Sequence, residues 1–223
     1  MPWRLVHFKK FRDPVCGLTH LLGLLFSVAG LVFLAACAGR EATASHVVAF
    51  SIYGVSLILL YGTSSLYHLL PVAERRLTIL RRLDHIMIFM LIAGTYTPVC
   101  LIPLRGEWGW SLLGVIWGLT GMGIFIKMFW LHAPRRLYTG IYLAMGWMVI
   151  IAIYPLAKAL PAAALAWLLS GGLFYTGGAI IYVSKRPNIV PGIFGFHELW
   201  HLFVMAGSIS HWWVMMRYIL PLR

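Results

Sequence analysis

Long apolar segments, separated by short polar connections, follow one another along the whole chain. Each has at least the length, about 20 residues, that a helix needs to cross the hydrocarbon core of a bilayer. Backbone in lipid must satisfy its own hydrogen bonds, and the chain lacks the alternating pattern of a barrel strand, so the segments predict helices. Seven are expected, over residues 14–38, 46–70, 83–104, 108–131, 137–156, 160–183 and 196–220.

The composition agrees with this pattern. Of 223 residues, 61% are hydrophobic and only 11% are charged, and the mean hydropathy is +0.86. A soluble domain does not have this balance. The sequence therefore predicts an all-α protein, a seven-transmembrane helix bundle that forms a single domain over residues 1–223, with a basic cytoplasmic tail at residues 1–13.

The basic residues are unevenly distributed along the chain. A net charge of +12 would suggest a nucleic-acid partner in a soluble protein. Here 13 of the 18 Lys and Arg residues fall in the tail or around the connections that follow the second, fourth and sixth segments. The positive-inside rule places those connections and the N-terminus in the cytoplasm and the C-terminus outside. No nucleic-acid partner is expected.

The start of the chain has an alternative interpretation. Leu34-Ala-Ala-Cys37 resembles a lipoprotein cleavage box, and Ala36-Cys-Ala38 resembles a signal-peptidase site. The apolar stretch from Pro14 to Ala36 is longer than the 7–15 residues, roughly, of a signal sequence, so we expect the first helix to be retained. The three cysteines, at positions 16, 37 and 100, have no metal-type spacing and are predicted to fill the core.

Two histidines stand four residues apart at the start of the last segment, in His197-Glu-Leu-Trp-His201. On a helix they share one face, about one turn apart, where both rings can bind one metal ion. Histidine is the commonest metal ligand, and ionisable groups inside a membrane point to function. Glu198 lies off this face and is expected to cap the start of the helix.

The predicted topology brings other polar residues to the same level of the membrane. The second segment ends there with Ser64 and His68, and the third begins there, with Asp84 and His85 in its expected first turn. Thr19 and His20 of the first segment lie on the same side. We therefore expect four distant stretches of sequence to converge near the cytoplasmic face.

The converging residues suit zinc. Three neutral imidazoles, those of His68, His197 and His201, leave one tetrahedral position open, which is typical of a catalytic zinc site. Water bound there would become a nucleophile near neutral pH. Asp84 could act as the general base or orient a ligand imidazole, and Ser64 could position water or substrate. The sequence predicts zinc as cofactor and Asp84 and Ser64 as catalytic residues.

The remaining histidines have simpler interpretations. His20 or His85, taken alone, is more typical of a hydrogen-bonded interfacial residue than of a ligand. His211 lies fourteen residues after His197, about 21 Å along a helix. It is expected to hydrogen-bond with Ser208 or Ser210.

Several motifs together resemble the haemolysin III family of the wider progestin and adipoQ receptor group. The resemblance implies seven helices, a cytoplasmic N-terminus, and a zinc ion held by His68, His197 and His201 beside Ser64 and Asp84. One departure is Asp13, which stands seven residues before His20, where the family often has Glu. The motifs are Ser64-Ser-Leu-Tyr-His68, Asp84-His85, Leu91-Ile-Ala-Gly-Thr-Tyr-Thr-Pro98, Tyr142-Leu-Ala-Met-Gly-Trp147, Lys185-Arg-Pro187, His197-x-x-x-His201 and Gly207-Ser208-x-x-His211.

The resemblance extends to function, because the group is similar to alkaline ceramidases. It implies a zinc-dependent hydrolase of a lipid amide or ester bond, with a lipid substrate taken from the bilayer, in the compact bacterial form of the family and hence in the bacterial inner membrane. The alternative is a non-enzymatic sensor or receptor with structural zinc. A cytolysin is the weakest alternative, because a chain with so many retained spans is poorly suited to release as a soluble toxin.

Overall fold

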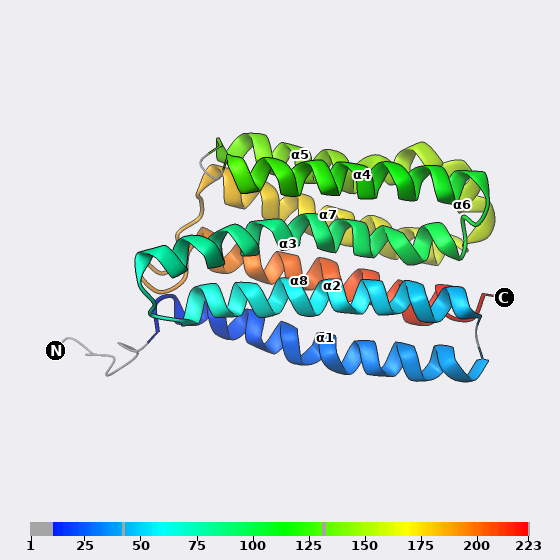
Figure 1. Ribbon diagram of the computed structural model, residues 1–223, viewed down its shortest axis with the longest axis horizontal. Coiled ribbons are helices and arrows are strands. Elements are labelled where there is room, and N and C mark those ends of the chain that lie inside the picture. Colours follow the sequence, from blue (N-terminus) through cyan, green and yellow to red (C-terminus); the bar gives the residue numbers. More distant parts are fainter. Residues whose placement is uncertain (1–10, 42, 131–132, 223) are drawn as a thin grey trace.

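The computed structural model describes residues 11–41, 43–130 and 133–222, which form a bundle of long helices (Figure 1). The predicted all-α class is confirmed, and residues 1–10 of the expected tail lie outside the described residues. Two short elements, the 3₁₀ helix η1 (Met148–Ala152) and the π-helix η2 (Met215–Ile219), extend α5 and α8. The α-helices are α1 (Pro14–Glu41), α2 (Ala44–Leu69), α3 (Glu74–Leu101), α4 (Glu107–Phe129), α5 (Arg135–Trp147), α6 (Ile153–Ala159), α7 (Ala162–Ser184) and α8 (Phe196–Val214).

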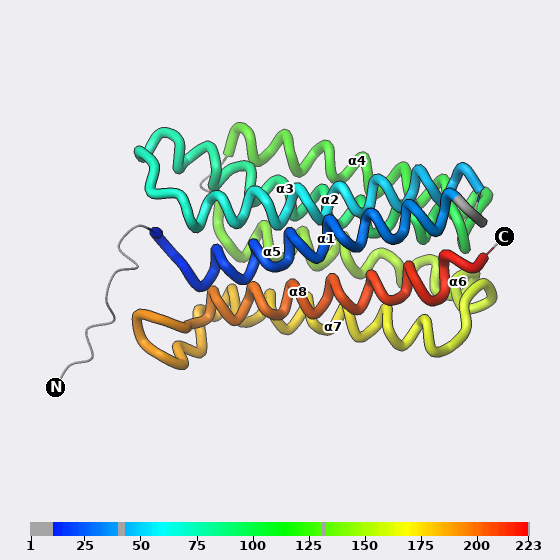
Figure 2. Tube along the Cα trace, turned by 90° about the horizontal axis from the view of Figure 1, so that it is seen from below, coloured from blue at the N-terminus to red at the C-terminus, as the bar shows by residue number. Residues whose placement is uncertain are grey.

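Six helical stretches of the described chain are long and apolar enough to cross a membrane. They are α1, α2, α3, α4, the run from α5 to α6, and α7. α8 is less apolar because it carries three histidines and a glutamate. It nevertheless runs the length of the bundle between α1 and α7 (Figure 2), so that its polar side chains are shielded by protein.

The outer surface of the bundle is strongly apolar. Leu25, Phe26, Phe125 and Phe129 each expose more than 60% of their surface. Such large exposed apolar side chains are unfavourable in water when they form a continuous belt. Together with the six spans, they define a multi-pass membrane protein.

The helices form a closed ring. α1 packs against α2 and α8, α2 against α3, α3 against α5, α5 against α7, and α7 against α8, while α4 covers the outside of α3. We call the end of the bundle where α1, α3, α5 and α8 begin the basic end. It carries Arg12, Arg75, Arg76, Arg81, Arg82, Lys127, Arg135, Arg136, Lys185 and Arg186. The positive-inside rule predicts that this end faces the cytoplasm.

α3 begins earlier than the hydropathy pattern predicts. It starts at Glu74 rather than residue 83, which places Asp84 and His85 in its third turn. The prediction of a first-turn position was therefore wrong. Residues 74–82 consist mainly of Arg, Leu and Glu, which are good helix formers. The helix therefore continues beyond its apolar part, and hydropathy reports only the apolar part.

The helix predicted over residues 137–156 is interrupted. α5 ends at Trp147 and gives way to η1. The cause is the Tyr96 hydroxyl of α3, which donates to the carbonyls of Met145 and Gly146 at 2.9 Å and accepts the N–H of Val149 at 2.8 Å. A side chain that inserts into the backbone ladder in this way breaks the regular helix.

His211 connects α8 to α7. Its Nε2 donates to the Leu168 carbonyl at 3.2 Å, and the absence of a side chain at Gly171 allows the ring to approach. The predicted interhelical role is correct, but the predicted partners are wrong. Ser208 instead bonds to tyrosines of α2 and α7, and Ser210 bonds within its own helix.

Candidate metal centre

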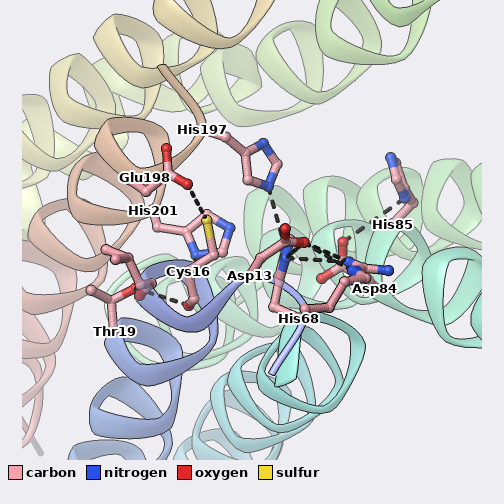
Figure 3. Close-up of polar contacts among 11 residues, drawn as sticks. Asp13, Cys16, Thr19, His68, Asp84, His85, His197, Glu198 and His201 are labelled. Atoms are coloured by element: carbon pink, nitrogen blue, oxygen red, sulfur yellow. Dashed lines mark hydrogen bonds and ion pairs between the residues drawn. The ribbon is translucent and has the colours of Figure 1, made fainter. Parts of the chain in front are cut away.

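Three imidazoles meet inside the basic end of the bundle (Figure 3). His68 comes from the last turn of α2, and His197 and His201 from the first turns of α8. The ring centroids lie 5.1 Å apart for His68 and His197, 5.0 Å for His68 and His201, and 4.9 Å for the two histidines of α8. Elements far apart in sequence thus bring three imidazole rings together.

The separation of two ring nitrogens fits a shared ion. His68 Nε2 and His197 Nε2 lie 3.4 Å apart. Two nitrogen ligands of a tetrahedral zinc, each about 2.0–2.1 Å from the metal, are about 3.3 Å from one another. The two imidazoles therefore already have the spacing of a ligand pair.

Hydrogen bonds orient two of the three rings. His68 Nδ1 contacts Asp13 Oδ2 at 3.1 Å, and His201 Nδ1 contacts the Cys16 carbonyl at 3.2 Å. Because an oxygen acceptor favours the proton on Nδ1, the Nε2 lone pair is left free for a metal. Carboxylate and carbonyl partners of this kind are typical of metal-binding histidines.

Asp13 is fixed at the start of α1. It precedes Pro14, the first helical residue, and its backbone N–H donates to the His68 carbonyl at 2.9 Å. Its carboxylate also pairs with Arg12 at 2.9 Å. The hydrogen bond from His68, with a further contribution from Arg12, holds the pKa of the Asp13 carboxyl below its ordinary value against the opposing effect of burial. Asp13 is therefore an ionised partner for His68.

Cys16 is a further potential ligand. Its Sγ and one ring nitrogen each from His197 and His201 all lie within 4.8 Å of one another, a possible metal-binding triad in which Cys16 stands where the sequence predicted His68. Cys16 is buried, as expected. Its thiol donates to Glu198 Oε1 at 3.2 Å, while Glu198 Oε2 accepts the Gly195 N–H at 2.8 Å and so caps α8 as predicted.

His20 lies directly against the site. Its ring stacks on that of His201, with centroids 3.6 Å apart and planes inclined by 17°, and meets the edge of Tyr61 at 5.0 Å. Both of its nitrogens are buried and have no hydrogen-bond partner among the described residues, contrary to the expectation of a satisfied histidine. Thr19, by contrast, bonds to the Val15 carbonyl of its own helix.

A cavity of about 600 Å³ opens beside the three imidazoles. Ser64, buried in α2, and Asp84 both line it, but neither forms a hydrogen bond with the imidazoles. The Asp84 carboxylate lies 3.9 Å from His85 Nδ1, which in turn bonds to the Arg81 carbonyl. The apolar part of the lining includes Leu60, Ile88, Leu91, Ile92, Leu143 and Val204.

The contact between Asp13 and His68 yields a prediction. Asp13→Asn is expected to weaken metal affinity by about 10–100-fold, because the amide lacks the charge that holds His68 in its ligating orientation. Competition with a chelator of known affinity measures the change. Glu74→Gln, which removes an exposed carboxylate at the same end of the bundle, is the control. Equal metal affinity in Asp13→Asn and the control would contradict the orienting role.

The protein is a bundle of membrane-spanning helices that encloses a histidine-rich site. Comparison with known proteins identifies the family to which it belongs. Residues 8–212 match the model of the family described as haemolysin-III related. Hemolysin-3 of Bacillus cereus is 43% identical over 220 residues, covering 98% of this chain and 96% of that protein. The chain belongs to the haemolysin III family.

Two further relatives extend the comparison. The Hemolysin-3 homolog of Bacillus subtilis (strain 168) is 40% identical over 202 residues, which cover 91% of this chain and 92% of that protein. The human monocyte to macrophage differentiation factor is 25% identical over 173 residues, 75% of this chain and 69% of that protein. The resemblance to this wider group, first indicated by the motifs, is confirmed.

Proposed function

We propose that this protein is an integral-membrane, zinc-dependent hydrolase that acts on an amide or ester bond of a lipid taken from the bilayer. One observation carries the proposal: paired imidazole nitrogens 3.4 Å apart lie in the wall of the cavity that also contains the Asp84 carboxylate. Nitrogen donors, with a thiol nearby, suit zinc better than Mg²⁺ or Ca²⁺. His68, His197 and His201 would hold the ion.

Each polar residue around the cavity has a role in this reaction. Zinc, when bound, supplies a Lewis acid that polarises a carbonyl and makes water acidic. Asp84 would accept the proton of the attacking water and return it to the leaving group. The Ser64 hydroxyl, buried in the cavity wall, would orient the water or the carbonyl, and Asp13 would keep His68 in its ligating orientation.

The volume and the lining of the cavity support a lipid substrate. Its volume of about 600 Å³ lies within the range of small-molecule sites, and a large part of its lining is aliphatic or aromatic. The helices that enclose it are themselves surrounded by apolar surface. An acyl chain could therefore occupy the cavity while the bond to be cleaved lies beside the imidazoles at the basic end.

A second candidate function is a membrane sensor or receptor with structural zinc. The observation that favours it is that neither Asp84 nor Ser64 forms a hydrogen bond with the imidazoles. In that case an ion would only tie α2 to α8. A cytolysin, which the names of the Bacillus relatives suggest, is less compatible with a multi-pass membrane protein.

Lipid profiling tests the proposal. Membranes that contain the wild-type protein are expected to lose a lipid amide or ester and gain its fatty acid, relative to membranes that contain an equal amount of Asp84→Asn. The reaction should then be reproduced with purified protein and that lipid. If neither comparison reveals a hydrolysed lipid while zinc still stabilises the protein, the hydrolase is excluded and the sensor or receptor is favoured.

A further inference from the structure

A group of cations lines the cavity on the side formed by α3, α4 and α5. Its members are Arg81 of α3, Lys127 of α4 and Arg135 of α5, which we call the cationic cluster. α4 lies outside the ring of helices, and Lys127 is the one residue of this helix that reaches the cavity. A single inward cation on an otherwise apolar helix indicates a specific role for its charge.

Lys127 is buried and forms no ion pair with a described acidic residue. Only 2% of its surface is exposed, and α4 is apolar enough to cross a membrane. Its Nζ lies over the Tyr138 ring, 3.4 Å from the centroid. No hydrogen bond or ion pair joins it to any other described residue. The ring satisfies one side of the ammonium group, and its N–H donors remain available on the side of the cavity.

Arg135 is held in the same way. Its guanidinium lies 4.3 Å from the centroid of the Tyr182 ring and donates from Nη1 to the Tyr182 carbonyl at 3.0 Å. Neither contact neutralises the charge. Aromatic rings therefore fix both cations in place before any anion binds, and this preorganisation lowers the entropy lost on binding.

The acidic residues of the cavity do not balance the cluster. Asp13 is paired with Arg12 and His68, and Glu198 caps the start of α8. Asp84 is then the one carboxylate left to face three cations. This excess of positive charge in a partly enclosed site attracts an anion.

We propose that the cationic cluster binds the anionic head group, a phosphate or a carboxylate, of an acyl lipid whose chain occupies the apolar part of the cavity. The existence of the binding site is argued from the cluster itself. The further statement that the bound lipid is the substrate rests on the proposed hydrolase function. Arg81 and Asp84, three residues apart, share one face of α3, so the head group would lie next to the carboxylate that handles the proton.

The test compares three probes on the full-length protein, purified in an uncharged detergent. They are a single-chain alkyl phosphate, the alcohol with the same chain, and inorganic phosphate, and binding is measured by calorimetry. We expect the alkyl phosphate to bind wild type about 10–100-fold more tightly than either other probe, because only it supplies both the anion and the chain.

Variants assign the binding to the cluster. Lys127→Met should abolish the preference for the alkyl phosphate over the alcohol, and Lys127→Arg should restore it. Arg136→Met removes an exposed charge one residue from Arg135, outside the cavity, and should retain the full preference. The preference should also persist in His197→Ala/His201→Ala. That result would show that the anion site is independent of the candidate metal centre.

Three results would overturn the proposal. Equal binding of the alkyl phosphate and the alcohol to wild type would show that charge is not recognised, and this comparison needs no variant to fold. A preference that survives in Lys127→Met would place the anion elsewhere. Inorganic phosphate binding as tightly as the alkyl phosphate would identify a site for a soluble anion instead of a lipid.

Discussion

Asp84→Asn is expected to lower the rate of lipid hydrolysis by about 10²–10⁴-fold while the protein keeps its fold and its metal. This is the usual scale of losing a general acid or base. Asparagine has nearly the shape of aspartate but cannot accept the proton. The three imidazoles are unchanged, because Asp84 forms no hydrogen bond with any of them. The effect should fall on kcat more than on KM.

The measurement requires saturating zinc, so that a weaker affinity for zinc is not mistaken for a slower chemical step. Glu74→Gln, on the exposed first turn of the same helix, is the matched control. Full activity of Asp84→Asn at saturating zinc would exclude Asp84 as the proton acceptor.

The convergence of the histidines could be predicted because each step uses local information. Apolar segments of membrane length define the spans, and the four spans between them bring the end of the second to the level of the start of the seventh. The spacing of His197 and His201 fixes their common face. His68 then falls at the same level without any knowledge of side-chain packing.

The level of His20 in the membrane was expected, but the side-chain contacts of α1 could not be predicted in this way. Asp13, Cys16 and His20 join the site because α1 packs between α2 and α8, a neighbour relation that hydropathy does not encode. The spacing of the cysteines gives no indication of this group for the same reason, since the potential co-ligands of Cys16 lie about 180 residues away on another helix. One signal was available: Cys16 and His20 are four residues apart and share a face.

The two errors in the predicted helix bounds have a different cause. The early start of α3 and the break after Trp147 both depend on backbone hydrogen bonds, whereas hydropathy reports only exposure to lipid. Good helix formers extend α3 beyond its apolar part. Tyr96, which is distant in sequence, replaces backbone partners in the interrupted helix. Neither effect changes the hydrophobic pattern from which the segments were predicted.

Purified wild type is expected to carry about one zinc per chain, and His197→Ala/His201→Ala less than a tenth of that amount. Elemental analysis measures the content. Two of the three imidazoles would be missing, and a single histidine does not retain zinc through purification. Because a ligand that binds only the folded protein stabilises it, zinc should raise the melting temperature of wild type and leave that of the variant unchanged.

His211→Ala is the matched control for this loss. It removes a half-buried histidine from the same helix and breaks its bond to Leu168, so it should lower stability but retain the metal. Single variants then identify the third donor. If His68 is the ligand, His68→Ala loses zinc and Cys16→Ser keeps it; if the thiol is the ligand, the results are reversed. Well-folded wild type without any bound metal would remove the centre itself.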